Sequence, residues 1–180
     1  HENEAAEYLR DICMNENMIQ SEVKEGKIEL IADSDGLLKV DRERLKKVNS
    51  FGELMIAARH GNTAVKKGDK LAGMRIIPLV IEKEKMHKAA AICADGPILE
   101  LKEFHKKKVG IITTGNEVYH KRIEDTFTPV IKEKLAEYDT EVIYHEIFDD
   151  NHEKITKGCL TAIEKGADLV ICTGGMSVDP

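Results

Sequence analysis

The second half of the chain, from Phe104 onward, alternates short apolar runs with segments of helical periodicity. The apolar runs have the length and composition of buried strands, and they occupy residues 109–113, 141–148 and 169–172. Strands that are separated by helices of this length are joined by right-handed crossovers and lie parallel. The pattern therefore predicts an α/β unit whose strands all end at one edge of a sheet.

Two helices are predicted between these strands. The apolar positions of the first are Phe127, Val130, Ile131 and Leu135. Pro129 falls in its first turn, where proline is tolerated. The second helix starts with Asp150 as its N-cap and Glu153 three residues later, and Gly166 follows its end. The apolar positions of the second are Ile155, Cys159 and Ile163.

Each predicted strand ends in glycine, hydroxyl or carboxyl residues. These residues are Thr114, Gly115, Asn116 and Glu117 after the first strand, Asp149 and Asp150 after the second, and Thr173, Gly174, Gly175 and Ser177 after the third. Ligands of open parallel sheets bind beyond the carboxyl ends of the strands. Glycine turns and hydroxyls suit a phosphate, and carboxylates tolerate one when a cation lies between them. A turn or a helix cap explains any one cluster, but three on one edge favour a phosphate and Mg²⁺ site.

The first half is less regular and predicts a small α+β and β-rich module. Helices are expected at residues 4–14, 41–48 and 82–94, and short strands at residues 19–23 and 27–31. A compact β unit follows from Leu54, with Lys67-Gly68-Asp69 as the turn of a hairpin. His60 and Arg75 could reach a ligand, but a turn histidine and a surface arginine are the better interpretation.

Composition limits the classes of function. The 180 residues are 42% hydrophobic and carry a net charge of −6, which suits a soluble globular protein and argues against a nucleic-acid partner. The four cysteines show no CxxC pairing, so reduced thiols and a cytoplasmic location are expected. No apolar run approaches the roughly 18 residues of a membrane span. Because the chain begins at His1, we expect a piece of a longer protein.

Four stretches carry a family resemblance: TTGNEV, RIEDTF, IFDDN and DLVICTGGMSVDP, in that order. With them, residues 108–180 resemble the molybdopterin-binding domain of molybdenum cofactor biosynthesis proteins. The whole chain, through HGNTAVKKGDKLAGMRIIPL, resembles molybdopterin molybdotransferase-like proteins. Lys121 and Asp139 stand where relatives often carry glycine. The resemblance implies a three-layer αβα domain with a mostly parallel sheet at 104–180, truncated at its C-terminal end, preceded by a smaller α+β/β module at 1–103.

The resemblance also implies a function, the insertion of molybdate into adenylated molybdopterin with release of AMP and help from Mg²⁺. Glu117 and Asp149 would be the catalytic and metal-binding carboxylates. The pterin-binding residues implied are Thr114, Gly115, Asn116, Asp125, Thr126, Asp150, Thr173, Gly174, Gly175 and Ser177. Partners would be a small pterin phosphate and other molybdenum cofactor biosynthesis proteins, with a homo-oligomer as an option and no membrane contact.

Two other classes stay open. The same domain occurs in proteins related to nicotinamide-nucleotide deamidase and ADP-ribose hydrolase, where a phosphate and metal site performs hydrolysis. A pterin-binding module without catalysis is the third option. In the family a further acidic residue follows the GGxSV turn, and it would fall after Pro180. We therefore expect an incomplete site in this chain, whether or not the parent protein is an enzyme.

Overall fold

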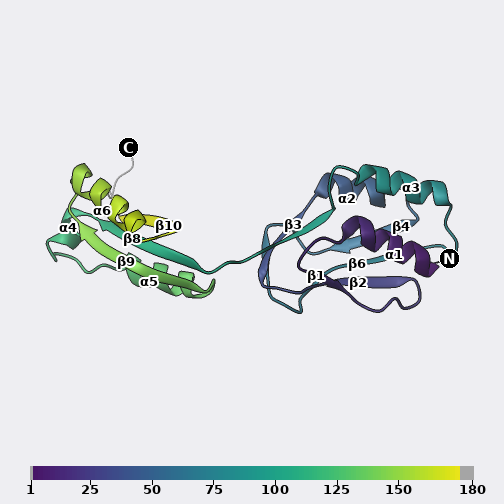
Figure 1. The fold of residues 1–180 in the computed structure, drawn as a ribbon, viewed down its shortest axis with the longest axis horizontal. Helices are drawn as coiled ribbons and strands as arrows, with labels where there is room; N and C mark the ends of the chain where they lie inside the picture. The colour runs from purple at the N-terminus through teal and green to yellow at the C-terminus, as the bar shows by residue number, and fades with distance from the viewer. Residues whose placement is uncertain (1, 175–180) are drawn as a thin grey trace. The chain divides into compact units, whose positions relative to one another are not determined.

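The structure is a computed structural model that describes residues 2–174. The chain forms two compact units, His1–Phe104 and His105–Pro180 (Figure 1), so the division lies one residue after the boundary expected from the sequence. The first unit is the longer of the two. Each unit has its own sheets and helices.

The first unit is built from antiparallel strands and three helices. Its elements are α1 (Glu2–Cys13), β1 (Met18–Gln20), β2 (Lys27–Ala32), β3 (Gly36–Val40), α2 (Arg42–Asn49), β4 (Leu54–Ala58), β5 (Thr63–Val65), β6 (Lys70–Ile76), α3 (Lys83–Ile92) and β7 (Leu99–Glu103). One sheet has the order β1-β2-β6-β4 and the other has the order β5-β3-β7. The helices predicted at 4–14, 41–48 and 82–94 are confirmed as α1, α2 and α3.

Alternating burial along the strands produces the core of the first unit. In β2, Ile28, Leu30 and Ala32 are buried, while the residues between them are half-buried. Helix α1 buries Ala5, Ala6, Leu9 and Cys13, and α1 contacts β6 and β2. The inward residues of one sheet face therefore join the apolar face of α1 in a single core.

The hairpin predicted around Lys67-Gly68-Asp69 is wrong. The turn exists, because the Asp69 N–H donates to the Lys66 carbonyl at 3.0 Å. However, β5 before the turn pairs with β3, whereas β6 after it pairs with β2 and β4. The chain crosses here from one sheet to the other. Turn chemistry predicts a reversal, but pairing depends on apolar faces that lie far apart in the sequence.

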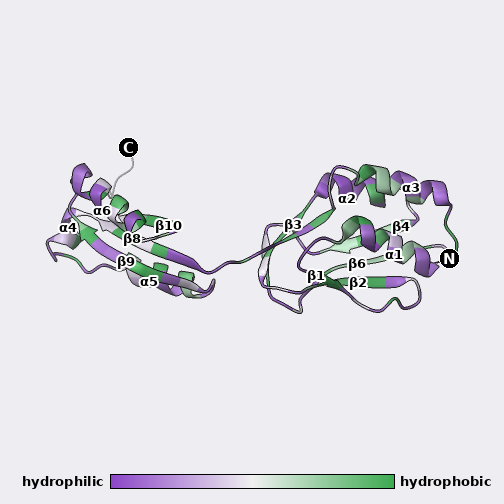
Figure 2. Cartoon of the chain, viewed as in Figure 1, coloured by the Kyte–Doolittle hydropathy of each residue, from purple (hydrophilic) through white to green (hydrophobic). Residues whose placement is uncertain are grey.

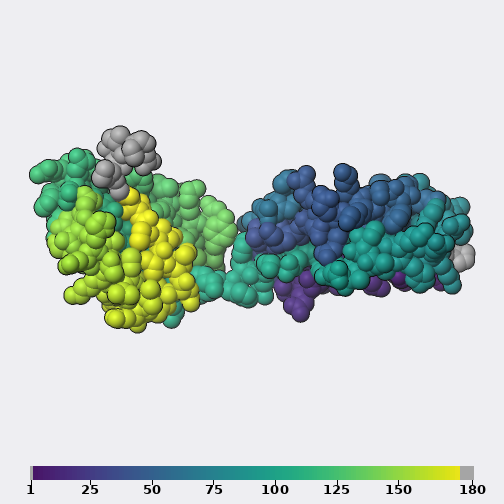
Figure 3. Space-filling model, turned by 90° about the horizontal axis from the view of Figure 1, so that it is seen from above, coloured from purple at the N-terminus to yellow at the C-terminus, as the bar shows by residue number. Residues whose placement is uncertain are grey.

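The second unit contains a parallel sheet with helices packed on it. Its elements are β8 (Lys107–Thr114), α4 (Asn116–Tyr119), α5 (Phe127–Ala136), β9 (Thr140–Phe148), α6 (His152–Glu164) and β10 (Leu169–Gly174). The strand order is β10-β8-β9, and both pairings are parallel, as the sequence predicts. Apolar residues, green in Figure 2, occupy the middle of β8 and much of β10, and β10 lies at the surface of the unit in Figure 3.

Two glycines let α6 approach the sheet closely. A Cβ on Gly110 of β8 would lie 2.6 Å from the Ala162 Cβ of α6, and one on Gly158 would lie 2.4 Å from the Phe148 ring. On the other face of β8, Thr113 Oγ1 hydrogen-bonds to Thr128 Oγ1 of α5 at 2.9 Å. Because neighbouring strand residues point to opposite faces, α5 and α6 cover opposite faces of the sheet. The α/β fold class is therefore confirmed.

The start and the apolar face of α6 differ from the prediction. Asn151, not Asp150, is the N-cap, since its Oδ1 accepts from the Lys154 N–H at 3.1 Å. Both residue types cap helices well, so the sequence alone did not separate them. Ile155 and Cys159 are partly buried, but Ile163 is 57% exposed. The buried positions are Gly158 and Ala162, because small side chains allow the close approach.

Lys121 and Asp139 adopt φ values of +56° and +50°. This left-handed region carries a steric cost for a residue with a Cβ and favours glycine. The places where relatives often have glycine are therefore places where this backbone turns left-handed.

The cysteines are free thiols, and the Sγ atoms of Cys159 and Cys172 lie 3.7 Å apart. Within residues 2–174, no helix has both the length and the apolar character needed to cross a membrane.

Candidate functional site

The three strands of the second unit end together. Gly174 of β10 lies opposite Thr114 of β8, and Thr114 lies opposite Phe148 of β9. Across these ends, Thr114 Oγ1 donates to the Thr173 carbonyl at 3.4 Å and the Gly115 N–H donates to the Phe148 carbonyl at 3.1 Å. The predicted shared edge is thus confirmed for the described residues, and we call it the strand-end site.

The segment after β8 turns sharply into the short helix α4. Gly115 has φ +136°, and a Cβ at this position would meet no atom within 4 Å. The Oδ1 atom of Asn116 accepts from the Asp150 N–H at 3.4 Å, so this segment is joined to the one after β9. Gly115 therefore leaves open space next to the backbone, as a ligand-binding turn requires.

Gly174 has a structural explanation that needs no ligand. Its φ is +97°, and a Cβ there would lie 2.0 Å from the Thr114 carbonyl oxygen. Glycine is required for β10 to end beside β8. The predicted site residues Gly175 and Ser177 lie outside the described residues.

Glu117 lies in α4 with its side chain exposed. Its carbonyl oxygen accepts from the Arg122 N–H at 2.8 Å and from the Ile123 N–H at 3.4 Å, which fixes the start of the following loop. Its carboxylate is thus displayed from a short, hydrogen-bonded helix directly after β8.

Asp149 is the more enclosed of the two predicted catalytic carboxylates, with a side chain that is 23% exposed. Its Oδ2 accepts from the Lys154 ammonium at 2.7 Å. This hydrogen bond is the main cause that lowers the pKa of Asp149 below 3.8. Its Oδ1 is buried and has no hydrogen-bond partner within residues 2–174. The sequence predicted the carboxylate but gave no sign of its lysine partner, five residues ahead in the next helix.

Asp125 caps a helix. Its Oδ1 accepts from the N–H groups of Phe127 and Thr128, each at 3.0 Å, at the start of α5. Burial would raise the pKa of Asp125, but the hydrogen bonds from Thr128 and Phe127 and the nearby His145 outweigh it and lower the pKa. Thr126 follows at the helix terminus, where its side chain makes no capping hydrogen bond. The structure therefore gives Asp125 a clear structural role.

The variant Asp125→Ala should reduce the free energy of unfolding of the second unit by about 1–2 kcal/mol, because two helix N–H groups lose their acceptor. Asp125→Asn keeps an acceptor oxygen and should lose less. Urea unfolding followed by tyrosine fluorescence measures this, since Tyr119, Tyr138 and Tyr144 lie in the second unit.

The Asp125 carboxylate should also make part of the stability depend on pH. Its pKa in the folded state lies below the ordinary 3.8, so its contribution is present above about pH 4 and is lost as the pH falls through the lowered pKa. Urea midpoints for Asp125→Ala that match the wild type would contradict the capping role.

A partly buried polar cluster next to the strand-end site was not predicted. His145 Nε2 lies 3.2 Å from both Thr113 Oγ1 and Thr128 Oγ1, and 3.9 Å from Asp125 Oδ2. Burial is the main cause that lowers the pKa of His145 below 6.5, and Lys132 adds to it. A threonine at the end of an apolar strand was the available signal. The cluster connects the start of α5 to β8 at Thr113, the residue before Thr114.

Metal-binding capacity in the described part of the chain is small. No group of three or more His, Cys, Asp or Glu side chains there could hold a metal ion. Mg²⁺, however, often uses only one or two carboxylates, together with waters and substrate phosphates. Asp149, whose side chain is 23% exposed, fits such a partial set through one carboxylate oxygen, and Glu117 is the other predicted member.

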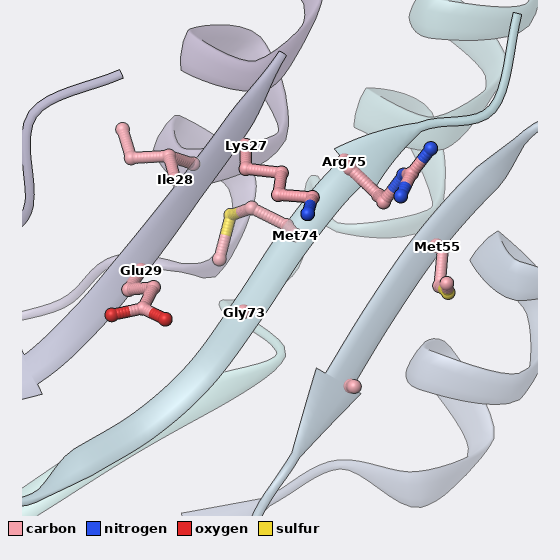
Figure 4. Close-up of a pocket in the computed structure, with 8 residues that line it drawn as sticks. Lys27, Ile28, Glu29, Met55, Gly73, Met74 and Arg75 are labelled. Atoms are coloured by element: carbon pink, nitrogen blue, oxygen red, sulfur yellow. The ribbon is translucent and has the colours of Figure 1, made fainter. Parts of the chain in front are cut away.

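A separate hollow of about 200 Å³ lies on the open face of the β2-β6-β4 sheet in the first unit. Lys27, Arg75 and Met55 lie side by side on its three strands, and Gly73 leaves the space between them (Figure 4). Glu29 at its rim pairs with Lys70 at 2.9 Å. No residue predicted from the strand ends contributes to this hollow. Arg75 is half-buried in this sheet face, which modifies the prediction of a surface arginine.

Comparisons with known proteins bear on the second unit most directly. Residues 110–180 match the family model described as "Probable molybdopterin binding domain". A competence-damage inducible protein of Bacillus cereus is 36% identical over 66 residues, which is 37% of this chain and 16% of that protein. The molybdopterin molybdenumtransferase of Haemophilus influenzae is 31% identical over 123 residues, which is 63% of this chain and 28% of that enzyme. The chain thus spans less than a third of either relative.

Among solved structures, the tungsten cofactor synthesizing protein MoaB from Pyrococcus furiosus matches with a TM-score of 0.37 and 32% identity, covering 38% of this chain and 42% of that one. The molybdopterin biosynthesis moeA protein from Pyrococcus horikoshii matches with a TM-score of 0.33 and 14% identity, covering 98% of this chain and 66% of that one. The comparison rests on the family model, which covers β10, β9 and residues 110–114 of β8. Residues 110–180 are therefore similar to the molybdopterin-binding domain family of molybdenum cofactor biosynthesis proteins.

Proposed function

We propose that the strand-end site binds the phosphate-bearing pterin of molybdenum cofactor biosynthesis. The observation that supports this most is the common register of Gly174, Thr114 and Phe148, which brings three polar segments to one edge in a domain of this family. The Thr114 hydroxyl would exchange its long, 3.4 Å hydrogen bond to the Thr173 carbonyl for the phosphate, beside the open space at Gly115. Asn116, Asp150 and Thr173 complete the described rim, and Gly175 and Ser177 belong to the same proposal.

We further propose that the parent protein inserts molybdate into adenylated molybdopterin and releases AMP. Glu117 and Asp149 would hold Mg²⁺ against the phosphates, and the ion would neutralise charge that develops there. The enclosed position of Asp149 supports this role, because a half-buried carboxylate keeps a fixed orientation. The chain's own part is to orient the pterin against the strand ends.

The test of binding is calorimetry with molybdopterin on Thr114→Val. This change keeps the shape and removes the hydroxyl, so we expect an affinity loss of about tenfold, the size of one hydrogen bond to a charged group. The matched control is Thr161→Val, because Thr161 lies near the far end of α6 and its hydroxyl donates to the Lys157 carbonyl of the same helix. Equal affinities in all three proteins would contradict a phosphate site at the strand ends.

Substrate turnover separates the alternatives. Metal-dependent release of AMP from adenylated molybdopterin supports the transferase. Turnover of ADP-ribose or of nicotinamide nucleotide would replace it with a hydrolase, and tight pterin binding without turnover would leave a binding module. These assays require the parent protein at full length, because the chain covers only 28% of its molybdenumtransferase relative.

A further inference from the structure

Asp149 already has a cation, which the chain itself provides. The Lys154 ammonium lies 2.7 Å from Asp149 Oδ2, and it is also 5.6 Å from the centre of the Tyr119 ring. Lys154 comes from the first turn of α6, Tyr119 from α4 and Asp149 from the end of β9. The ammonium thus lies between three elements that meet at the strand-end site.

Only one oxygen of Asp149 is available to an incoming ion. Oδ1 is buried, so a cation that keeps part of its water shell reaches the carboxylate through Oδ2. An ammonium and a divalent ion on the same oxygen would lie within a few ångströms of each other and repel strongly. The two cations therefore exclude one another at Oδ2.

The Lys154 side chain can move into solvent when a cation displaces it from Asp149. Its side chain is 49% exposed, and a lysine stem rotates freely in solvent. Once it leaves Asp149, its ammonium is a mobile positive charge at the rim of a site that is proposed to take a phosphate. Lys154 can therefore pair with Asp149 when the metal is absent and contact the phosphate when the metal is bound.

We propose that Lys154 competes with a divalent cation for Oδ2 of Asp149 and that, once displaced, it contacts the phosphate of the bound substrate. This inference rests on the proposed function for the metal role of Asp149. It adds a positioning residue that the sequence pattern did not include, and it makes the occupancy of the metal depend on a residue that is not a metal ligand.

The experiment is a titration with Mn²⁺ alone, with free Mn²⁺ measured by electron paramagnetic resonance, on the full-length protein. Lys154→Met removes the charge and keeps the stem, so Mn²⁺ should bind about three- to tenfold more tightly, as expected when a competing ion pair is lost. Lys154→Arg keeps the charge and should stay near the wild type. Lys157→Met, one turn along the same helix and exposed, removes a charge that does not touch Asp149 and is the matched control.

Each outcome has one meaning. Tighter binding in Lys154→Met alone supports the competition. If Asp149→Asn weakens Mn²⁺ binding but Lys154→Met leaves it unchanged, the competition is refuted while the metal role of Asp149 stands. If Asp149→Asn leaves Mn²⁺ binding unchanged both in the wild-type protein and in Lys154→Met, the competition and the proposed metal role of Asp149 are both wrong. Equal tightening in Lys154→Met and Lys157→Met would reduce the effect to net charge and refute the proposal.

The second half of the proposal has its own measurement. Molybdopterin affinity in the presence of saturating Mn²⁺ should fall about tenfold in Lys154→Met and much less in Lys154→Arg, because the ammonium is replaced by a neutral group. Unchanged affinity in Lys154→Met would remove the phosphate contact and leave only the competition.

Discussion

Asp149→Asn in the full-length protein should lower Mg²⁺-dependent release of AMP by about 100-fold or more while pterin binding persists. The amide keeps the size and the acceptor oxygen of the side chain but removes the charge that a divalent ion needs, and losses of this size are typical when charge stabilisation of a transition state is removed. Glu117→Gln should act in the same direction. The measurement is the initial rate of AMP release as a function of Mg²⁺ concentration.

The control for this experiment is Glu141→Gln. Glu141 lies near the start of β9, at the opposite end from Asp149, and it is exposed and forms a 3.9 Å ion pair with Lys106. Its neutralisation changes net charge equally and should leave the rate unchanged. Full Mg²⁺-dependent turnover in both Asp149→Asn and Glu117→Gln would show that the carboxylates after β8 and β9 are structural and that the roles assigned to them are wrong.

Gly110→Val should destabilise the second unit by about 3 kcal/mol. The first added carbon would lie 2.6 Å from the Ala162 Cβ, where α6 and β8 are in van der Waals contact, and overpacking of this kind costs up to several kcal/mol. Urea unfolding followed by tyrosine fluorescence reports the change. Ala162→Gly in the same chain should recover part of the loss, although a helix glycine itself costs about 1 kcal/mol.

Gly73→Val provides the comparison, because Gly73 is also a strand glycine but a Cβ there would meet no atom within 4 Å. That variant should keep wild-type stability, since valine suits a strand and the space is open. If Gly110→Val unfolds at the same urea concentration as Gly73→Val, then α6 does not pack against β8 as closely as the structure indicates.

The arrangement of the second unit was predictable because it follows from patterns in short, consecutive segments of the sequence. Apolar runs of strand length, separated by helices, determine a parallel sheet and place the strand ends on one edge. The observed register of Thr114 with Gly174 and Phe148 follows from that pattern. Helix starts were less certain, since adjacent Asp150 and Asn151 compete for one cap and only packing decides between them.

Interactions between distant residues could not be predicted from the pattern. Asp149 pairs with Lys154, which stabilises its charge, and the strand-end pattern gave no indication of this pair. His145 reaches Thr113 and Thr128 only because β8, β9 and α5 meet on one face. In the first unit, the pairing of β3 with β7 was missed for the same reason.

The pairing of β3 with β7 affects the order in which the first unit can fold during synthesis. Leu38 of β3 lies opposite Leu101 of β7, about 60 residues later in the chain, and β5 covers the other edge of β3 only after it too has been made. At about 5–20 residues per second, synthesis of the intervening segment takes on the order of 3–12 seconds. During that interval β3 has an unpaired edge of the kind that pairs with foreign strands. The first unit is therefore most vulnerable to misassociation while residues 41–98 emerge from the ribosome.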